Sequence, residues 1–230
     1  CGLHPDRPRG ELVDLYPLLN SLRIAALSTA LIFFVGLWAA QVISRCHPVV
    51  KGVLDVVLTL PLVLPPTVVG YLLLCLLGPN GAVGSVVARL LDVRLTMVWY
   101  AGVFSSAVVA FPLMYRTARG AFESYDTTLT DAARTLGRGN MWIFWHIQLP
   151  CCRQGILAGT VLAFARALGE YGAPSMIAGY TPGKTATIST TVYQFWRTGN
   201  DAMALRWVLV NLAIAGVVLL AINLLERKER

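Results

Sequence analysis

The chain has 230 residues, of which 56% are hydrophobic and only 13% are charged. A soluble domain is typically about a quarter charged, and a chain of this length has too little interior to hide so much apolar surface from water. The composition therefore excludes a disordered chain, a collagen-like chain and a disulfide scaffold, and it favours an integral membrane protein in contact with lipid. The net charge of +7 is typical of basic loops facing anionic headgroups, and it does not indicate a nucleic-acid partner.

Cysteine and histidine give no sign of catalytic or metal chemistry. The five cysteines include no CxxC pair, and the three histidines are far apart in the chain. Metal sites and disulfide frameworks both require repeated spacings that are missing here. A membrane-embedded enzyme would need a nucleophile and base, or a set of metal ligands, and the sequence offers neither. We therefore expect no catalytic residues, no metal site and no cofactor bound by this chain.

Five apolar segments are long enough to cross a bilayer, which takes about 20 mostly apolar residues. They span residues 24–44, 56–77, 95–115, 154–178 and 207–225. Five such segments in one chain are hard to reconcile with buried helices of a soluble protein. The sequence predicts an all-α integral membrane protein with five transmembrane helices, forming a single domain over residues 1–230.

An odd number of spans places the two termini on opposite sides of the membrane. The C-terminal residues 226–230 are mostly basic, and basic segments stay in the cytoplasm. The N-terminus is then outside, and residues 45–51 and 116–153 face inward. These inner segments carry slightly more Lys and Arg than the outer ones, so the bias has the expected sign.

The large inner loop, residues 116–153, contains a predicted short helix over residues 128–136. Thr128 and Asp131 have capping-box spacing at its start, and Gly137 suits the left-handed position after its end. Four residues recur at helical spacing and form one apolar face with a small-residue centre, which another protein surface could approach closely: Leu129, Ala132, Ala133 and Leu136. The alternative is an amphipathic loop that rests on the bilayer.

A second short helix is predicted over residues 141–147. It carries three aromatic side chains, Trp142, Phe144 and Trp145, which suit a membrane interface. We expect Pro150 to end this helix, because proline cannot continue the hydrogen-bond ladder.

The spacing within this loop resembles the EAA motif of ABC-importer permeases. The matching positions are Asp131, Ala132, Ala133, Gly137, Ile147, Leu149 and Pro150. The departure is Asp131, where the motif has glutamate. The resemblance implies that residues 128–136, including Leu136, form a coupling helix that docks into a groove on a separate ATPase subunit.

Two further motifs are similar to those of molybdate permeases and their sulfate relatives: residues 60–71, LPLVLPPTVVGY, and residues 164–173, FARALGEYGA. The resemblance covers roughly residues 17–225 and implies a permease subunit of a type I ABC importer in a prokaryotic cell membrane. Its implied partners are a second copy of the chain, two ATP-binding cassette subunits that hold ATP and Mg, and an extracytoplasmic oxyanion-binding protein. The implied cargo is a tetrahedral oxyanion, molybdate first, with sulfate, thiosulfate and tungstate left open.

The proline-rich motif is a candidate wall of the translocation path. Pro61, Pro65 and Pro66 remove backbone donors and free carbonyl groups, and irregular backbone at membrane depth needs protein or water around it. Thr67 adds a hydroxyl group, and Gly70 permits close approach. The alternative is a kinked helix that serves packing alone.

The fourth segment carries a pair of charges and a pair of glycines. Arg166 and Glu170 are spaced to pair on one helix face, either as a structural ion pair or as a gate. Gly155 and Gly159 form a GxxxG pattern, which favours close helix packing in a dimer or inside the subunit.

Two other readings of the sequence are weaker. An ion-gradient secondary transporter would need charged relays across several spans, and only Arg166 and Glu170 are suitable. Residues 179–185 end like a phosphate-binding P-loop, but three residues rather than four separate the glycines. The sequence therefore predicts that ATP is hydrolysed on a partner and not on this chain.

Overall fold

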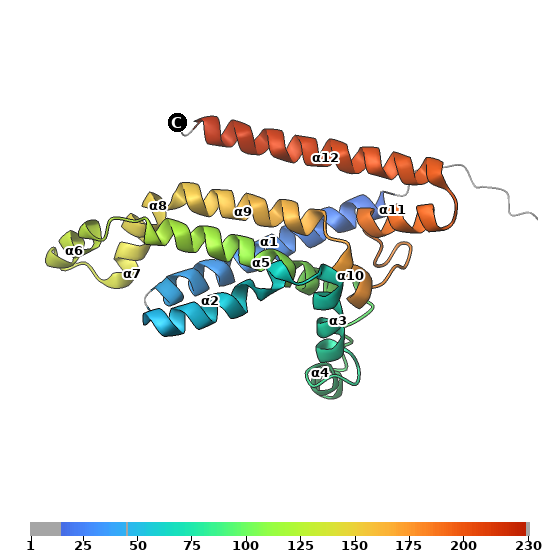
Figure 1. Ribbon diagram of the computed structural model, residues 1–230, viewed down its shortest axis with the longest axis horizontal. Coiled ribbons are helices and arrows are strands. Elements are labelled where there is room, and N and C mark those ends of the chain that lie inside the picture. The colour runs from blue at the N-terminus through green and yellow to red at the C-terminus, as the bar shows by residue number, and fades with distance from the viewer. Residues whose placement is uncertain (1–14, 45, 229–230) are drawn as a thin grey trace, which may run out of the picture.

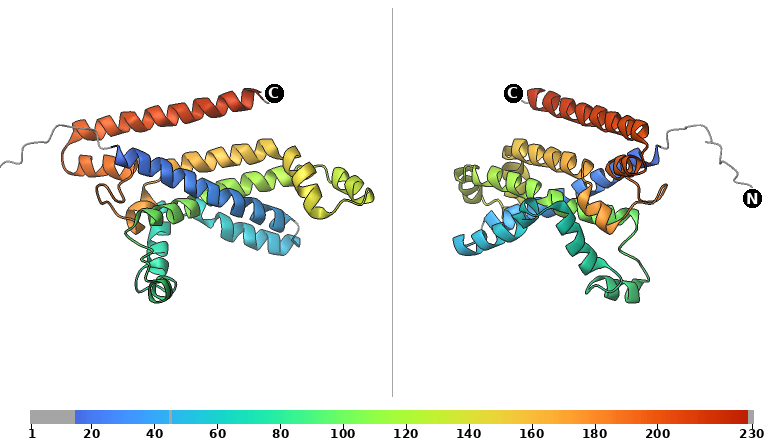
Figure 2. Two further views of the ribbon diagram at one scale, coloured as in Figure 1. Left: turned by 180° about the vertical axis from the view of Figure 1, so that it is seen from behind. Right: turned by 45° about the vertical axis from the view of Figure 1, so that its right-hand side comes forward.

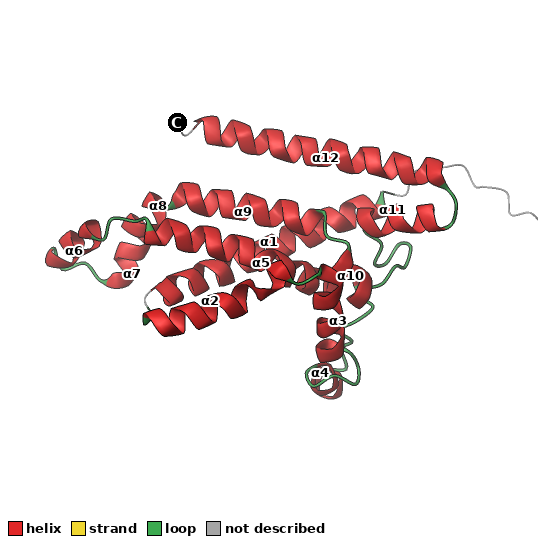
Figure 3. Cartoon of the chain, viewed as in Figure 1, coloured by secondary structure: helices red, strands yellow, loops and turns green. Residues whose placement is uncertain are grey.

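The structure is a computed structural model that describes residues 15–44 and 46–228, with side chains described up to residue 220. This part of the chain contains helices and loops and no strand (Figures 1 and 3). The all-α prediction is therefore confirmed. The helices are α1 Tyr16–Ser44, α2 Pro48–Val63, α3 Pro66–Leu77, α4 Gly84–Leu91, α5 Trp99–Glu123, α6 Thr128–Thr135, α7 Asn140–Ile143, the π-helix η1 Phe144–Gln148, α8 Leu149–Cys151, α9 Arg153–Leu168, α10 Gly172–Ile177, α11 Ile188–Arg197 and α12 Asp201–Lys228.

Helices α1, α5 and α9 pack together and form the core. The core is rich in alanine, and its largest fully buried side chains include Met114 and Tyr115 of α5. Small residues let helix backbones approach closely. In a membrane this close packing holds helices together, because the hydrophobic effect does not drive helix association in apolar lipid. Gly36 of α1 shows this, because a Cβ atom there would lie 3.0 Å from Cγ of Met114.

The GxxxG pattern serves this core. A Cβ atom on Gly155 would lie 2.6 Å from Cβ of Ala121, and one on Gly159 would lie 3.0 Å from Cβ of Thr117. Both neighbours belong to α5 of the same chain. The two glycines thus let α9 approach α5, and this settles the choice between a dimer contact and the subunit core in favour of the core.

Gly155→Ala should lower the stability of the folded subunit by about 1–3 kcal/mol, because the added methyl group overpacks the contact with Ala121. The matched control is Gly52→Ala in α2, where no atom lies within 4 Å of the new Cβ. The control should be neutral or stabilising by roughly 0.5–1 kcal/mol, because alanine favours a helix over glycine. Thermal unfolding in detergent, followed by tryptophan fluorescence, compares the two; equal midpoints would contradict the packing role.

Among the described residues, two helices are long and apolar enough to span a membrane: α1, and α12 over Asp201–Leu220. A third candidate is the pair α2 and α3, which is bent by 110°. The predicted segment over residues 56–77 is thus divided between two helices, with the break at the prolines that interrupt it. Pro61 is tolerated inside α2, whereas Leu64 and Pro65 are extended, with ψ of 141° and 134°. The reason is that a residue followed by proline is driven out of the helical region, and this happens twice in Leu64-Pro65-Pro66.

The predicted span over residues 154–178 is also interrupted. Helix α9 ends at Leu168, and α10 is a separate helix of six residues. Arg166 thus lies in α9, whereas Glu170 lies in the break between the two helices, not at the centre of a continuous span as expected from sequence.

The third predicted span, residues 95–115, is displaced in the structure. Residues 92–98 are not helical, and both Asp92 and Met97 have positive φ. Helix α5 begins at Trp99 and continues to Glu123, so residues 116–123 belong to this helix and not to the loop. The predicted loop of residues 116–153 therefore starts at Ser124.

Helices α1, α2, α5, α9 and α12 run roughly along one direction, whereas α3 and α4 project to the side (Figures 1 and 2). The far end of α12 lies at the same end of the bundle as α6 and α7 (Figure 1). A hydrogen bond of 3.0 Å from Nε2 of Gln41 to Oε1 of Gln148 ties the last turns of α1 to η1. The segment after α1 and the loop after α5 therefore share one end of the molecule.

Candidate functional site

Helix α6, the candidate coupling helix, begins differently from the sequence prediction. The backbone N–H of Thr128 donates to Oδ1 of Asp126 at 2.9 Å, and this bond holds the pKa of Asp126 below its ordinary value. Thr127 and not Thr128 is the cap residue, and its side chain makes no capping bond. The predicted capping box of Thr128 and Asp131 is therefore wrong. Asp131 instead pairs with Arg134 on the exposed side of the helix, at 3.2 Å.

The end of α6 follows the prediction for Gly137. Its φ is +77°, a conformation that glycine adopts without steric cost. The N–H of Gly137 donates to the carbonyl of Arg134, and the N–H of Arg138 donates to the carbonyl of Ala133. These two bonds form a Schellman motif, which satisfies the last carbonyl groups of the helix. The motif also fixes the direction in which the chain leaves α6.

The apolar residues of α6 do not all face outward. Ala133 is buried within the chain, at 5% exposure, where α6 packs on α7 and η1. Ala133 is thus covered within its own chain, and docking of the α6 face on a partner stays a prediction. Ala132 is exposed, Leu129 is 46% exposed and Leu136 is 80% exposed. The surface that α6 offers is formed by Leu129, Ala132 and Leu136.

The second half of the loop is one helical run, not a helix ended by Pro150. It passes through α7, η1 and α8, and Pro150 lies in α8. The N–H of Leu149 donates to the carbonyl of Phe144, five residues earlier. This wider π turn accommodates the proline, which would otherwise interrupt the i to i−4 ladder. Ile147 and Leu149 are half-buried against the bundle, and Pro150 is exposed.

The proline-rich motif and the motif of residues 164–173 meet in space, at the crossing of α3 and α10. A Cβ atom on Gly70 would lie 2.8 Å from Cα of Ala173, and one on Gly172 would lie 2.9 Å from Cβ of Pro66 and 3.0 Å from the backbone N of Thr67. Both glycines are therefore required for this close approach. Pro61 is half-buried in α2, away from the crossing, and Pro65 and Thr67 are exposed.

Arg166 and Glu170 form the predicted ion pair, between Nη1 and Oε2. The Glu170 side chain is 2% exposed, and that of Arg166 is 32% exposed. The other carboxylate oxygen of Glu170 accepts the backbone N–H of Ala173 at 3.1 Å. Glu170 therefore connects the end of α9 to the start of α10, directly beside the crossing with α3.

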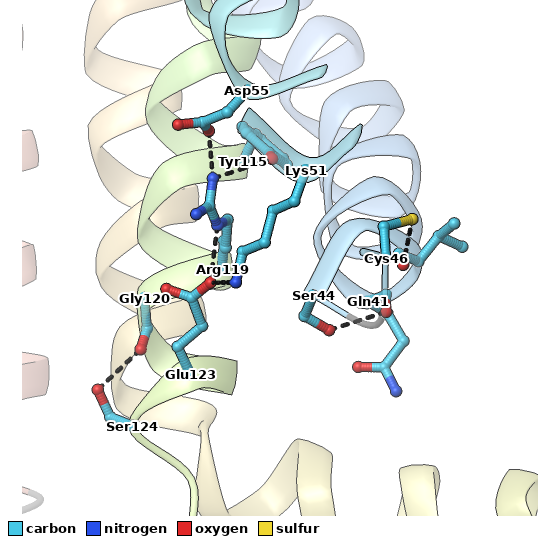
Figure 4. Close-up of polar contacts among 11 residues, drawn as sticks. Gln41, Ser44, Cys46, Lys51, Asp55, Tyr115, Arg119, Gly120, Glu123 and Ser124 are labelled. Atoms are coloured by element: carbon cyan, nitrogen blue, oxygen red, sulfur yellow. Dashed lines mark hydrogen bonds and ion pairs between the residues drawn. The ribbon is translucent and has the colours of Figure 1, made fainter. Parts of the chain in front are cut away.

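A second set of charges was missed by the sequence reasoning (Figure 4). Lys51 and Asp55 of α2 face Arg119 and Glu123 of α5. Lys51 pairs with Glu123, and Arg119 pairs with both Asp55 and Glu123, the latter at 2.9 Å. Arg119 also contacts the hydroxyl of the buried Tyr115, at 3.5 Å. Opposite charges at i and i+4 on both helices, Lys51/Asp55 and Arg119/Glu123, were the available signal.

Comparison with known proteins places the chain in a family. Residues 32–230 match the family model described as "Binding-protein-dependent transport system inner membrane component". The chain belongs to this family. It is therefore an inner-membrane permease component, as the motifs predict.

Two curated relatives and one solved structure agree with this assignment. The Escherichia coli K12 molybdenum transport system permease protein ModB is 41% identical over 214 residues, which are 93% of each chain. The Synechocystis sulfate transport system permease protein CysW is 32% identical over 89% of this chain and 74% of its own length. A bacterial alginate ABC transporter, crystallised with an alginate pentasaccharide-bound periplasmic protein, has a TM-score of 0.76 at 19% identity and shares the fold over 95% of this chain and 80% of that one.

The P-loop-like segment of this permease is a closed turn. The hydroxyl of Thr185, which is buried, accepts the N–H of Thr181 at 2.9 Å and donates to the carbonyl of Gly179 at 3.3 Å. Tyr16 of α1 donates to the carbonyl of Lys184. A P-loop needs that hydroxyl for Mg²⁺ and a preceding strand, and here the segment lies between α10 and α11. The geometry thus fits a structural loop tied to α1.

Proposed function

We propose that this permease imports a tetrahedral oxyanion, and molybdate in particular, with energy from ATP hydrolysed on separate subunits. The observation that carries the proposal is the 41% identity to the E. coli ModB permease over 93% of both chains. Similarity to the sulfate permease is lower, at 32%. Sulfate, thiosulfate and tungstate are the alternative cargoes, because they share the tetrahedral anionic geometry.

The proposed topology has five crossings: α1, the broken pair α2 and α3, α5, α9 with α10, and α12. The end that carries α6, α7 and the far end of α12 is cytoplasmic, and the start of α1 lies outside. Two observations support this arrangement. At one end, Gln41–Gln148 joins the last turns of α1 to η1, and Lys51–Glu123 joins the start of α2 to the end of α5. At the other end, Tyr16 reaches the loop at Lys184.

In this arrangement the surface of Leu129, Ala132 and Leu136 docks on an ATP-binding cassette subunit, which holds ATP and Mg. Two copies of the permease form the path, each with one ATPase subunit, and an extracytoplasmic oxyanion-binding protein delivers the cargo to the outer face. Exposed leucine on a two-turn helix with a fixed exit direction fits a groove on another protein. It fits a solvated loop poorly, because exposing an apolar side chain to water is unfavourable.

The break between α2 and α3 is the proposed wall of the path, together with α10. Pro65 and Pro66 have no N–H to donate to the carbonyl groups four residues earlier, those of Pro61 and Leu62, and carbonyl groups without a helical donor suit a wet cavity. Of the side chains described, Glu170 is the one buried charged group, and Arg166 neutralises it. A path without a strong cationic site can release an oxyanion, whereas an ion-gradient transporter would need a relay of charges.

The test is ATP hydrolysis by the reconstituted complex with its own binding protein. Molybdate should stimulate hydrolysis and accumulate inside proteoliposomes, and sulfate at the same concentration should do so less. If sulfate stimulates hydrolysis as much as molybdate or more, sulfate and not molybdate would be identified as the cargo. Absence of ATP-dependent uptake of any of these oxyanions would contradict the proposed function.

A further inference from the structure

Helix α2 is attached to the rest of the chain in an unusual way. None of its residues is buried, and its valines at positions 49, 50, 53, 56 and 57 are between 50% and 69% exposed. Only Leu54 and Leu58 pack against the core from this helix. Its main neighbour is α5, and α1 contacts it little. Apolar packing within the subunit therefore fixes α2 only weakly.

The charges described above supply the missing attachment (Figure 4). We define the α2–α5 charge network as Lys51, Asp55, Arg119 and Glu123. Its side chains are between 18% and 39% exposed, so water screens them only partly. An isolated exposed ion pair stabilises little, but linked pairs that share one guanidinium are geometrically specific. Lys51 and Arg119 both donate to Oε1 of Glu123, which holds the pKa of that carboxyl, at the last residue of α5, below its usual range.

The α2–α5 charge network lies close in the chain both to the loop after α5 and to the break after α2. Glu123 ends α5, and only four residues separate it from the start of α6 at Thr128. At its other end, α2 runs into the break at Leu64 and then into α3, whose Gly70 packs on Ala173. The network therefore lies between the loop that faces the ATPase and the broken span that lines the proposed path.

We propose that the α2–α5 charge network is the link that makes α2 follow the end of α5 when the ATPase subunits move the coupling loop. The four residues are positioning residues: they touch neither cargo nor nucleotide, and they act through the broken span. This inference rests on the proposed function. Without the network, movement of α6 would shift the end of α5 and leave α2 behind. ATP hydrolysis would then continue with little transport.

The first measurement is the number of oxyanions transported per ATP hydrolysed, in proteoliposomes that contain the full complex and its binding protein. Complexes with Asp55→Asn or Lys51→Met should each assemble normally. Each change should nevertheless lower this ratio at least about fivefold, which is the smallest factor usual for coupling between two sites. The matched control is Arg116→Gln, which removes a positive charge from an exposed position one turn before Arg119, outside the network. The control should keep the wild-type ratio.

The second measurement is rescue. A variant with all four charges reversed, Lys51→Glu, Asp55→Lys, Arg119→Glu and Glu123→Lys, keeps every pairing and should restore the ratio. A wild-type ratio in the neutralised variants, or an uncoupled reversed variant, would overturn the link. Loss of assembly in the neutralised variants would also overturn it, because the network would then only brace the fold. If the wild-type complex itself shows no oxyanion uptake, the proposed function fails instead.

Discussion

Leu136→Arg should release the ATPase subunits from the permease while the helical bundle stays folded. Leu136 is 80% exposed at the end of α6, where it has few neighbours in its own chain. A leucine side chain that becomes buried at an interface contributes about 1.5–3 kcal/mol, and arginine would in addition place a charge in an apolar groove. Together these effects should weaken docking by at least about two orders of magnitude, since each 1.4 kcal/mol is a factor of ten. Co-purification of tagged ATPase subunits measures the effect.

The control for this experiment is Leu136→Met, which keeps the side chain apolar and of similar volume and should retain the ATPase. Ala133→Arg is not an equivalent test, although Ala133 belongs to the apolar face that the sequence predicts for this helix. Ala133 is buried against its own loop, so arginine there would displace α6 from α7 and η1. Normal co-purification and normal substrate-stimulated hydrolysis of Leu136→Arg would contradict docking through this face.

The features that sequence predicted well are local ones. Gly137 marks the end of α6 because a left-handed residue after a helix strongly favours glycine, and no tertiary contact is needed to see this. The pairing of Arg166 with Glu170 follows from their i and i+4 spacing and from the cost of stranding charges in an apolar segment. The all-helical class follows from the lengths of the apolar segments.

The features that sequence missed depend on distant contacts or on competing local rules. Lys51 and Glu123 are 72 positions apart, and nothing in either segment specifies the other. Ala132 and Ala133 look equivalent on paper, but only the packing of α7 and η1 decides which of them is buried. Pro61 and Pro150 were both expected to disrupt a helix. Each is tolerated, whereas the consecutive Pro65 and Pro66 produce the bend of 110°.

The second large effect concerns Arg166 and Glu170, whose environments are unequal. Removing one partner of a buried ion pair costs about 3–5 kcal/mol, because it strands the other charge. Arg166→Gln would strand Glu170, whose side chain is 2% exposed. Glu170→Gln would leave Arg166 without its partner, but the Arg166 side chain is 32% exposed and can still reach water. The amide oxygen of the new glutamine could also still accept the N–H of Ala173. We therefore expect Arg166→Gln to be the more damaging single change.

The double variant, Arg166→Gln with Glu170→Gln, separates a structural pair from a gate. If the pair is structural, the double variant should recover thermal stability and assembly relative to Arg166→Gln, because no charge is left stranded. If the pair holds the break between α9 and α10 closed during the cycle, all three variants should assemble, with basal ATP hydrolysis rising as transport falls. The burial of Glu170 and its second bond, to the N–H of Ala173, favour the structural result. Unfolding midpoints and basal hydrolysis rates measured together decide between the two, and wild-type values for all three variants would exclude both roles.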